Sequence, residues 1–251
     1  PLVFAVTRVL GAPEGNYHAW SRWVHRHIDD VAEQCGLRSL QTNEPLRCAA
    51  LLPAISRVEG PIALLEVGAS AGLCLYPDRY SYLYEGNRAS LRLDPTSGPS
   101  PVELRCEVRG ARLPSVTMPD VVWRAGIDLA PLDARDSDDR AWLAGLVWPG
   151  ETGRVERIHA AVDVVAADPP LMVSGDALGV LADAAALAPH DATLVVLTPG
   201  VLAYLPFQKR EALIDLSRKL GRWITIDAPT LHSGWNKPPQ NWQEGFAVAL
   251  D

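Results

Sequence analysis

In the first part of the chain, apolar residues recur at the spacing of an amphipathic helix. Within residues 17–35 they follow one another at steps of three and four, and Gly36 is a favourable place for the helix to end. A second helix is predicted to start at the capping pair Thr42 and Asn43 and to end at about Leu52, before Pro53. We therefore expect residues 1–60 to form a helical N-terminal segment that precedes the sheet.

From residue 61 onward, short apolar runs alternate with helical stretches. Strands are predicted at residues 62–65, 121–123, 171–173, 193–197 and 223–226, and helices at residues 137–148, 152–167, 178–187 and 208–220. Strands and helices that alternate in this way favour a mainly parallel sheet covered on both faces. The predicted fold class is α/β, a Rossmann-like, doubly wound sheet over residues 61–251.

Residues 73–118 interrupt this alternation. Residues 73–84 predict a short, broken helix around Pro77. The segments LRLD and VELRCEV alternate apolar with polar residues and are separated by the turn-rich PTSGPSP, a pattern typical of a β-hairpin. We expect a β insertion at about residues 85–118 that covers a substrate site.

Composition and charge limit the classes of function. The chain has 251 residues, 48% hydrophobic residues and a net charge of −7, with no basic run, so binding to nucleic acid is not expected. No apolar stretch is long enough to span a bilayer. The four cysteines form no C-x-x-C pair, which predicts neither a zinc site nor a disulfide framework, and reduced thiols favour the cytoplasm. The first residue is not methionine and an apolar run, Phe246 to Leu250, reaches almost to the end, so we expect part of a longer protein.

The bend at residues 66–72, EVGASAG, directly follows the first predicted strand. In one interpretation its glycines let a ligand approach the backbone, and a following helix presents free amide groups. The dinucleotide pattern G-x-G-x-x-G is not matched, because Ser70 replaces the second glycine. The looser pattern acid-x-G-x-(G/S)-x-G resembles the first motif of class I S-adenosylmethionine-dependent methyltransferases. The residues expected to bind the cofactor there are Glu66, Gly68, Ala69, Ser70 and Gly72.

A second interpretation reads the same bend as G-x-S-x-G, the nucleophile elbow of an α/β-hydrolase with Ser70 as nucleophile. Asp227 and His232 would complete the triad. Few strands precede Ser70, no His-Gly run supplies an oxyanion hole, and Glu66 has no role in an elbow. A third interpretation is a structural glycine turn without a ligand.

Polar residues stand at the ends of several predicted strands, where open α/β sheets bind their ligands. They are Glu66, Asp128, Asp176, Thr198 and Asp227. An acid at the end of the strand after the glycine bend is placed to bind ribose hydroxyls, which is the role expected of Asp128. Asp128 capping a turn is the alternative. The segment 229–244 is expected to be a loop that closes over the site.

Several segments together resemble one family. Thr42, Asn43, Glu44 and Arg47, then LLEVGASAGLCLYPDRYSYLY, RAGIDLAPLDARDSDDRAWLAGLVWP, PPLMVSGDAL and LVVLTPGVLAYL, are similar in this order to the domain-of-unknown-function family 2332. Members of that family look like class I methyltransferases at the level of the fold. The resemblance strengthens the expected architecture more than the chemistry.

The resemblance implies a protein that binds S-adenosylmethionine and transfers its methyl group to a small-molecule acceptor. By analogy, Asp176 would bind the adenine amino group, and Thr198 would be a further cofactor contact. Glu44 and Arg47 are expected to hold the acceptor, with Asp227 or His232 as general base and no metal ion. Besides the serine esterase, a non-catalytic Rossmann-like binding protein is the alternative.

Overall fold

The structure is a computed structural model that describes residues 1–41, 43–231 and 245–251. Its helices are α1 (Leu2–Val9), α2 (Tyr17–Arg26), α3 (Ile28–Leu37), α4 (Arg47–Ile55), α5 (Ser137–Gly145), α6 (Arg154–Ala167), α7 (Ala177–Ala185) and α8 (Phe207–Leu220). Its strands are β1 (Pro61–Val67), β2 (Ser81–Gly86), β3 (Ser90–Leu93), β4 (Glu103–Val108), β5 (Asp120–Asp128), β6 (Leu171–Ser174), β7 (Thr193–Pro199), β8 (Arg222–Asp227) and β9 (Ala247–Leu250). Three short 3-10 turns are η1 (Leu73–Leu75), η2 (Leu202–Tyr204) and η3 (Pro229–Leu231).

The main sheet confirms the predicted α/β class. Its strand order is β6-β5-β1-β7-β8-β9, with β9 antiparallel to β8 and the other neighbours parallel. In β1 every residue after Pro61 is buried, because helices cover both faces of the sheet. The chain passes from one side of β1 to the other between β6 and β7. This change of direction places a crevice at the carboxyl ends of β1 and β7.

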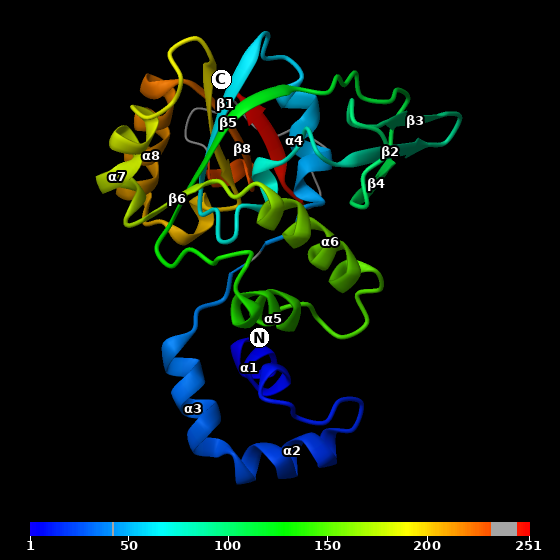
Figure 1. Cartoon of the computed structure of the whole chain (residues 1–251), viewed down its shortest axis with the longest axis vertical. Coiled ribbons are helices and arrows are strands. Elements are labelled where there is room, and N and C mark those ends of the chain that lie inside the picture. The colour runs from blue at the N-terminus through cyan, green and yellow to red at the C-terminus, as the bar shows by residue number, and fades with distance from the viewer. Residues whose placement is uncertain (42, 232–244) are drawn as a thin grey trace.

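Two apolar cores flank the sheet. Leu65, Val67 and Ile127 pack with α7 and α8 on one face. Ile62 and Leu64 point to the opposite face, because successive side chains of a strand alternate, and they pack with α4, α6 and the small sheet formed by β2, β3 and β4. In Figure 1, β2–β4 lie beside α4, away from α7 and α8. None of the described helices is long and apolar enough to cross a membrane.

The N-terminal helices form a group of their own below the sheet (Figure 1). Val6 of α1, Val31 of α3 and Trp142 of α5 share a small core, so α5 belongs to this group by packing. In contrast, α4 packs on the main sheet against β8 and β9. The division into a cap at residues 1–60 and a domain at residues 61–251 stays a prediction.

The single helix expected at residues 17–35 is two helices, and the break falls at His27. His27 leaves helical geometry (φ −118°, ψ 28°), and its ring stacks on Trp23 with 4.1 Å between centroids. Its Nδ1 lies 2.8 Å from the Trp23 carbonyl oxygen. Asp29 and Asp30 then fall in the first turn of α3, where the positive end of the helix dipole favours acids.

Helix α4 starts later than predicted and continues through Pro53 to Ile55. Proline has no N–H to donate to the carbonyl four residues earlier, which here is that of Ala49. The Tyr84 hydroxyl donates to this carbonyl at 2.8 Å, so the group that Pro53 leaves without a partner is satisfied by the inserted sheet.

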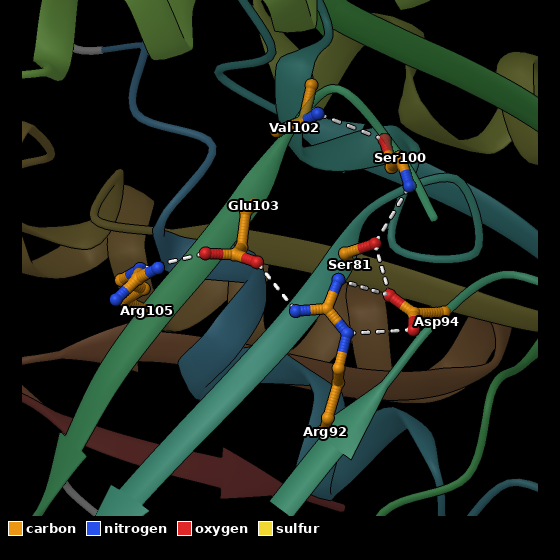
Figure 2. Close-up of polar contacts among 7 residues, drawn as sticks. All are labelled: Ser81, Arg92, Asp94, Ser100, Val102, Glu103 and Arg105. Atoms are coloured by element: carbon orange, nitrogen blue, oxygen red, sulfur yellow. Dashed lines mark hydrogen bonds and ion pairs between the residues drawn. The ribbon is translucent and has the colours of Figure 1, made fainter. Parts of the chain in front are cut away.

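The insertion is a three-stranded sheet, not a hairpin. Its central strand β2 (Ser81–Gly86) includes residues 81–84, predicted as helix, and is antiparallel to β3 and parallel to β4. Tyr82 and Tyr84 lie on the same face of β2, two residues apart, and are buried in the core that contains α4, which explains the strand. On the outer face Arg92 bridges Asp94 and Glu103 (Figure 2).

Candidate functional site

The crevice at the carboxyl ends of the parallel strands holds a cavity of about 350 Å³. This volume lies within the range of small-molecule sites, about 300–1,000 Å³. Five of the residues predicted from the sequence line it: Arg47, Gly68, Ser70, Asp128 and Asp176. No described residue of the inserted sheet lines this cavity, so the expectation that the insertion covers the site is wrong.

The bend after β1 differs from the predicted ligand-binding loop in the use of its amides. The N–H groups of Gly68 and Ala69 donate to the Ile127 carbonyl at 2.8 and 3.1 Å, and that of Ser70 donates to Asp128 Oδ2 at 2.8 Å. Only the three-residue turn η1 follows, so the expected helix N-terminus with free amides is not there. Residues of strand β5 accept these hydrogen bonds. Few backbone N–H groups of the bend therefore remain free to bind a phosphate.

Gly68 nevertheless has the conformation that close approach requires. Its φ is +73°, which favours glycine, and a Cβ at this position would lie 3.1 Å from Val201 Cγ2. Ser70 also has a positive φ, 53°, and its side chain is almost fully buried. The bend thus presents a bare backbone surface to the cavity beside one hydroxyl.

Asp128 organises one side of the cavity. Its Oδ1 accepts the Ala130 N–H at 2.9 Å, in addition to the Ser70 amide bound to Oδ2. Gln41 lies across this group: its Oε1 accepts the Ser70 hydroxyl at 2.7 Å, and its Nε2 donates to the Ala130 carbonyl at 2.7 Å. Each carboxylate oxygen can accept a second hydrogen bond, so Asp128 can still bind hydroxyl groups once Gln41 moves aside.

Arg47 lies on the other side, against the turn after β7. Its Nη1 donates to the Pro199 carbonyl at 2.8 Å. Gly200, with φ +77°, leaves room for the guanidinium, since a Cβ there would be 3.2 Å from Arg47 Nη2. Within the described part of the chain no carboxylate pairs with Arg47. An unpaired guanidinium at a cavity wall is suited to bind an anion.

The third charged position is Asp176, just after β6. It caps α7 by accepting the Leu178 N–H at 3.0 Å and pairs with Lys209 at 3.0 Å. Lys209 holds the pKa of the Asp176 carboxyl below its usual range. Since β6, β5, β1 and β7 are adjacent in this order, carboxylates lie at one end of the cavity and Arg47 at the other. Apolar side chains form the wall between them: Val67, Ile127, Leu129, Val201, Leu205 and Leu213.

Glu66 does not line this cavity, although it ends β1. Its side chain points to the face of Ile62 and Leu64, opposite to Val67, and is almost fully buried. Burial, and then the neighbouring Cys74 thiol, raise the pKa of the Glu66 carboxyl well above its usual range. Its Oε2 has no hydrogen-bond partner among the described residues. The predicted cofactor contact of Glu66 is therefore not supported.

Three further predicted cofactor residues also lie behind the cavity wall. Ala69 packs over Gly126 of β5, and the Cβ position of Gly72 lies 3.2 Å from Pro170 Cγ. Thr198 is fully buried, and its hydroxyl accepts the Trp223 indole N–H at 2.9 Å. Packing and hydrogen bonding inside the protein therefore explain why these three positions are alanine, glycine and threonine, without a ligand.

Of the two predicted catalytic residues, Asp227 does not line the cavity. His232 lies outside the described residues. Asp227 is fully buried, and burial raises the pKa of its carboxyl to about 6. The Thr225 hydroxyl lies 2.9 Å from both Asp227 Oδ2 and the Thr198 carbonyl. A hydroxyl has a single proton, so a protonated Asp227 satisfies both contacts by donating to Thr225.

Glu44 is part of an ion-pair cluster instead of a substrate site. Arg154 and Arg157 of α6 pair with it at 2.7 and 3.0 Å, and its Oε1 also accepts the Leu46 N–H at 2.9 Å. Glu44 does not line the cavity at the carboxyl ends of the strands. It fixes the start of α4, and thereby Arg47, relative to α6.

Sequence reasoning missed Gln41, Val201 and Tyr204, which all line the cavity. Gln41 lies in a loop and Tyr204 ends the short turn η2, and the sequence offers no signal for their position. Val201 follows the strand-end residues Pro199 and Gly200, a place where a ligand contact was to be expected. Across the described ranges, no group of three or more His, Cys, Asp or Glu residues is arranged to hold a metal ion.

Fold and cavity together define a Rossmann-like α/β protein with a cavity of about 350 Å³ at the point where the strand order reverses. The family model "Uncharacterized protein conserved in bacteria (DUF2332)" matches residues 6–243, so the chain belongs to this family, as the motifs indicated. No curated protein and no solved structure is significantly similar to the chain.

Proposed function

We propose that the chain is a methyltransferase that uses S-adenosylmethionine and acts on a small molecule. The observation that carries this proposal is the charge distribution of the cavity. Arg47, which has no carboxylate partner among the described residues, lies at one end, and Asp128 and Asp176 lie at the other. S-Adenosylmethionine has groups that match these positions: the carboxylate of its zwitterionic methionine end, and the hydroxyl and amino donors of its adenosine end.

The residues of the cavity have distinct roles in this proposal. Arg47 holds the methionine carboxylate through charge-assisted hydrogen bonds. Asp128 accepts hydrogen bonds from the ribose hydroxyls in place of the Gln41 amide, and Asp176 accepts from the adenine amino group. The apolar wall around Val67 and Ile127 excludes water. The backbone at Gly68 makes room for the ligand without donating to it, which suits a cofactor that has no phosphate.

When bound, the cofactor supplies an electrophilic methyl group, which an acceptor atom takes by in-line displacement. The chain then needs chiefly to hold the two partners in line. Neither Asp227 nor Glu44 reaches the cavity, so no described residue is assigned as general base. The four cysteines are free, which supports the proposal of a reducing, cytoplasmic location.

Calorimetric titration of the chain with S-adenosylmethionine and S-adenosylhomocysteine tests the proposal. We expect binding, and stabilisation against unfolding of about 2.7 kcal/mol when the ligand is present at 100 times its Kd. If neither ligand binds and neither stabilises the chain against unfolding, the chain is better described as a non-catalytic Rossmann-like binding protein.

The serine esterase remains a second candidate because Ser70 has the positive φ of a strained turn. Its hydroxyl, however, donates to Gln41, and no described histidine is hydrogen-bonded to it. A fluorophosphonate probe separates the two functions. The esterase requires labelling of the wild type and none of the Ser70→Ala variant, whereas the methyltransferase requires no labelling of either.

A further inference from the structure

A second cavity, of about 300 Å³, lies between the N-terminal helices and the sheet. Phe4 and Arg8 of α1 line one side of it, and Trp148 and Pro149, which follow α5, line another. Residues 40, 41 and 43, in the segment between α3 and α4, close it toward the sheet. The cavity is thus built by the N-terminal helical group together with the segment that leads into Arg47.

The two cavities are neighbours. Leu40, Gln41 and Tyr204 line both of them, so these side chains lie between the two spaces. Gln41 is also the residue that covers Ser70 and Asp128 in the first cavity. A molecule in the second cavity therefore lies directly beside the place assigned to the cofactor.

The charged side chains of the second cavity are neutralised within the protein. Arg8 pairs with Glu14 at 2.8 Å and donates to the carbonyl oxygens of Gly145 and Val147. Arg154 pairs with Glu44 and Glu151 at 2.7 and 2.6 Å. These guanidinium groups have their partners already, so the cavity offers little to a charged ligand.

Aromatic rings are prominent among the exposed side chains of this cavity. Phe4 and Trp148 contact each other with their ring planes tilted by 51° and 6.0 Å between centroids, and each exposes about half of its surface, 51% and 49%. Tyr204 is 79% exposed at the boundary with the first cavity. Exposed rings that converge on a cavity are suited to bind flat, apolar molecules by stacking and by burial of apolar area.

We infer that the second cavity is the acceptor subsite, and that the acceptor is an uncharged, flat aromatic molecule. This inference rests on the proposed function, because it takes the first cavity as the cofactor site. The partition formed by Leu40, Gln41 and Tyr204 then separates acceptor from donor, and its displacement brings the two into contact.

Binding of 2-naphthol, followed by saturation-transfer NMR and titration, tests this inference on the full chain. We expect 2-naphthol to bind the wild type, with and without saturating S-adenosylhomocysteine, and its charged analogue 2-naphthoate to bind more weakly. Trp148→Ala should weaken 2-naphthol binding about fivefold to twentyfold. Tyr17→Ala is the matched control, because Tyr17 is an exposed aromatic residue that does not line this cavity. It should leave the affinity unchanged.

Three results would overturn the inference: no binding of 2-naphthol, equal binding by the Trp148→Ala variant, or displacement by S-adenosylhomocysteine. Phe4→Leu provides a second variant of the same wall, should Trp148→Ala fail to fold. Failure of the proposed function has a different signature. In that case S-adenosylhomocysteine does not bind at all, while 2-naphthol still responds to Trp148→Ala, and the cavity is an aromatic site unconnected with methyl transfer.

Discussion

Replacement of Arg47 by methionine is the most direct perturbation of the proposed cofactor site. The change removes the guanidinium that lies against Gly200, for which the described part of the chain supplies no carboxylate partner. It also removes the 2.8 Å hydrogen bond to the Pro199 carbonyl. A hydrogen bond to a charged group contributes about 1.5–3 kcal/mol. We therefore expect Arg47→Met to weaken the binding of S-adenosylhomocysteine about 10- to 150-fold.

A comparison of two ligands separates this effect from general damage to the fold. Methylthioadenosine has the adenosine part but no carboxylate, so its affinity should be the same in wild type and variant. Arg222→Met is the control for the loss of one positive charge, because Arg222 stands at the amino end of β8 and does not line the cavity. Calorimetry measures the affinity of S-adenosylhomocysteine and of methylthioadenosine for the wild type, Arg47→Met and Arg222→Met. An equal loss of affinity for both ligands in Arg47→Met, or no loss for either, would refute the assignment.

Three further predictions concern stability, measured by denaturant unfolding. The pKa of Asp227, about 6, lies above its ordinary value of 3.8, so stability should fall by no more than about 3 kcal/mol as the pH rises from 4 to 6. Asp227→Asn should abolish this dependence, and an unchanged profile would contradict it. Gly72→Ala should cost about 1–3 kcal/mol more than Gly60→Ala, because the two glycines share a φ near +77° but only Gly72 is crowded. Tyr84→Phe should cost about 1–3 kcal/mol and Tyr17→Phe almost nothing; equal costs would argue against the bond to α4.

The sequence predicted an element correctly wherever burial gives its apolar residues a regular spacing. The apolar run of β1, the glycine bend and the alternation after residue 120 predicted the main sheet, because a strand covered on both faces has few polar residues. The sequence also placed Asp128 and Asp176 at the cavity, since both stand where parallel strands end. Glu66 and Asp227 also stand at strand ends, but that position does not show whether a side chain points into the cavity or away from it.

Other errors arose where tertiary contacts override local pattern. Tyr82 and Tyr84 gave no clear strand signal, because Pro77 and the preceding glycine bend suggested a broken helix. Pro53 predicted the end of α4, and a hydroxyl distant in sequence instead allows the helix to continue. Gln41 could not be found from the sequence, because its role depends on a contact 87 residues away, with Asp128.

Helix α4 links the two sheets of the molecule. It packs on β8 and β9 of the main sheet and on β4 of the inserted one, and Pro53 leaves it with a carbonyl that only the insertion satisfies. Loss of the small sheet would expose that carbonyl and the adjoining apolar face, weakening the helix that carries Arg47. The insertion should therefore melt together with the main sheet, in one cooperative transition, and not as a peripheral module that can be trimmed away.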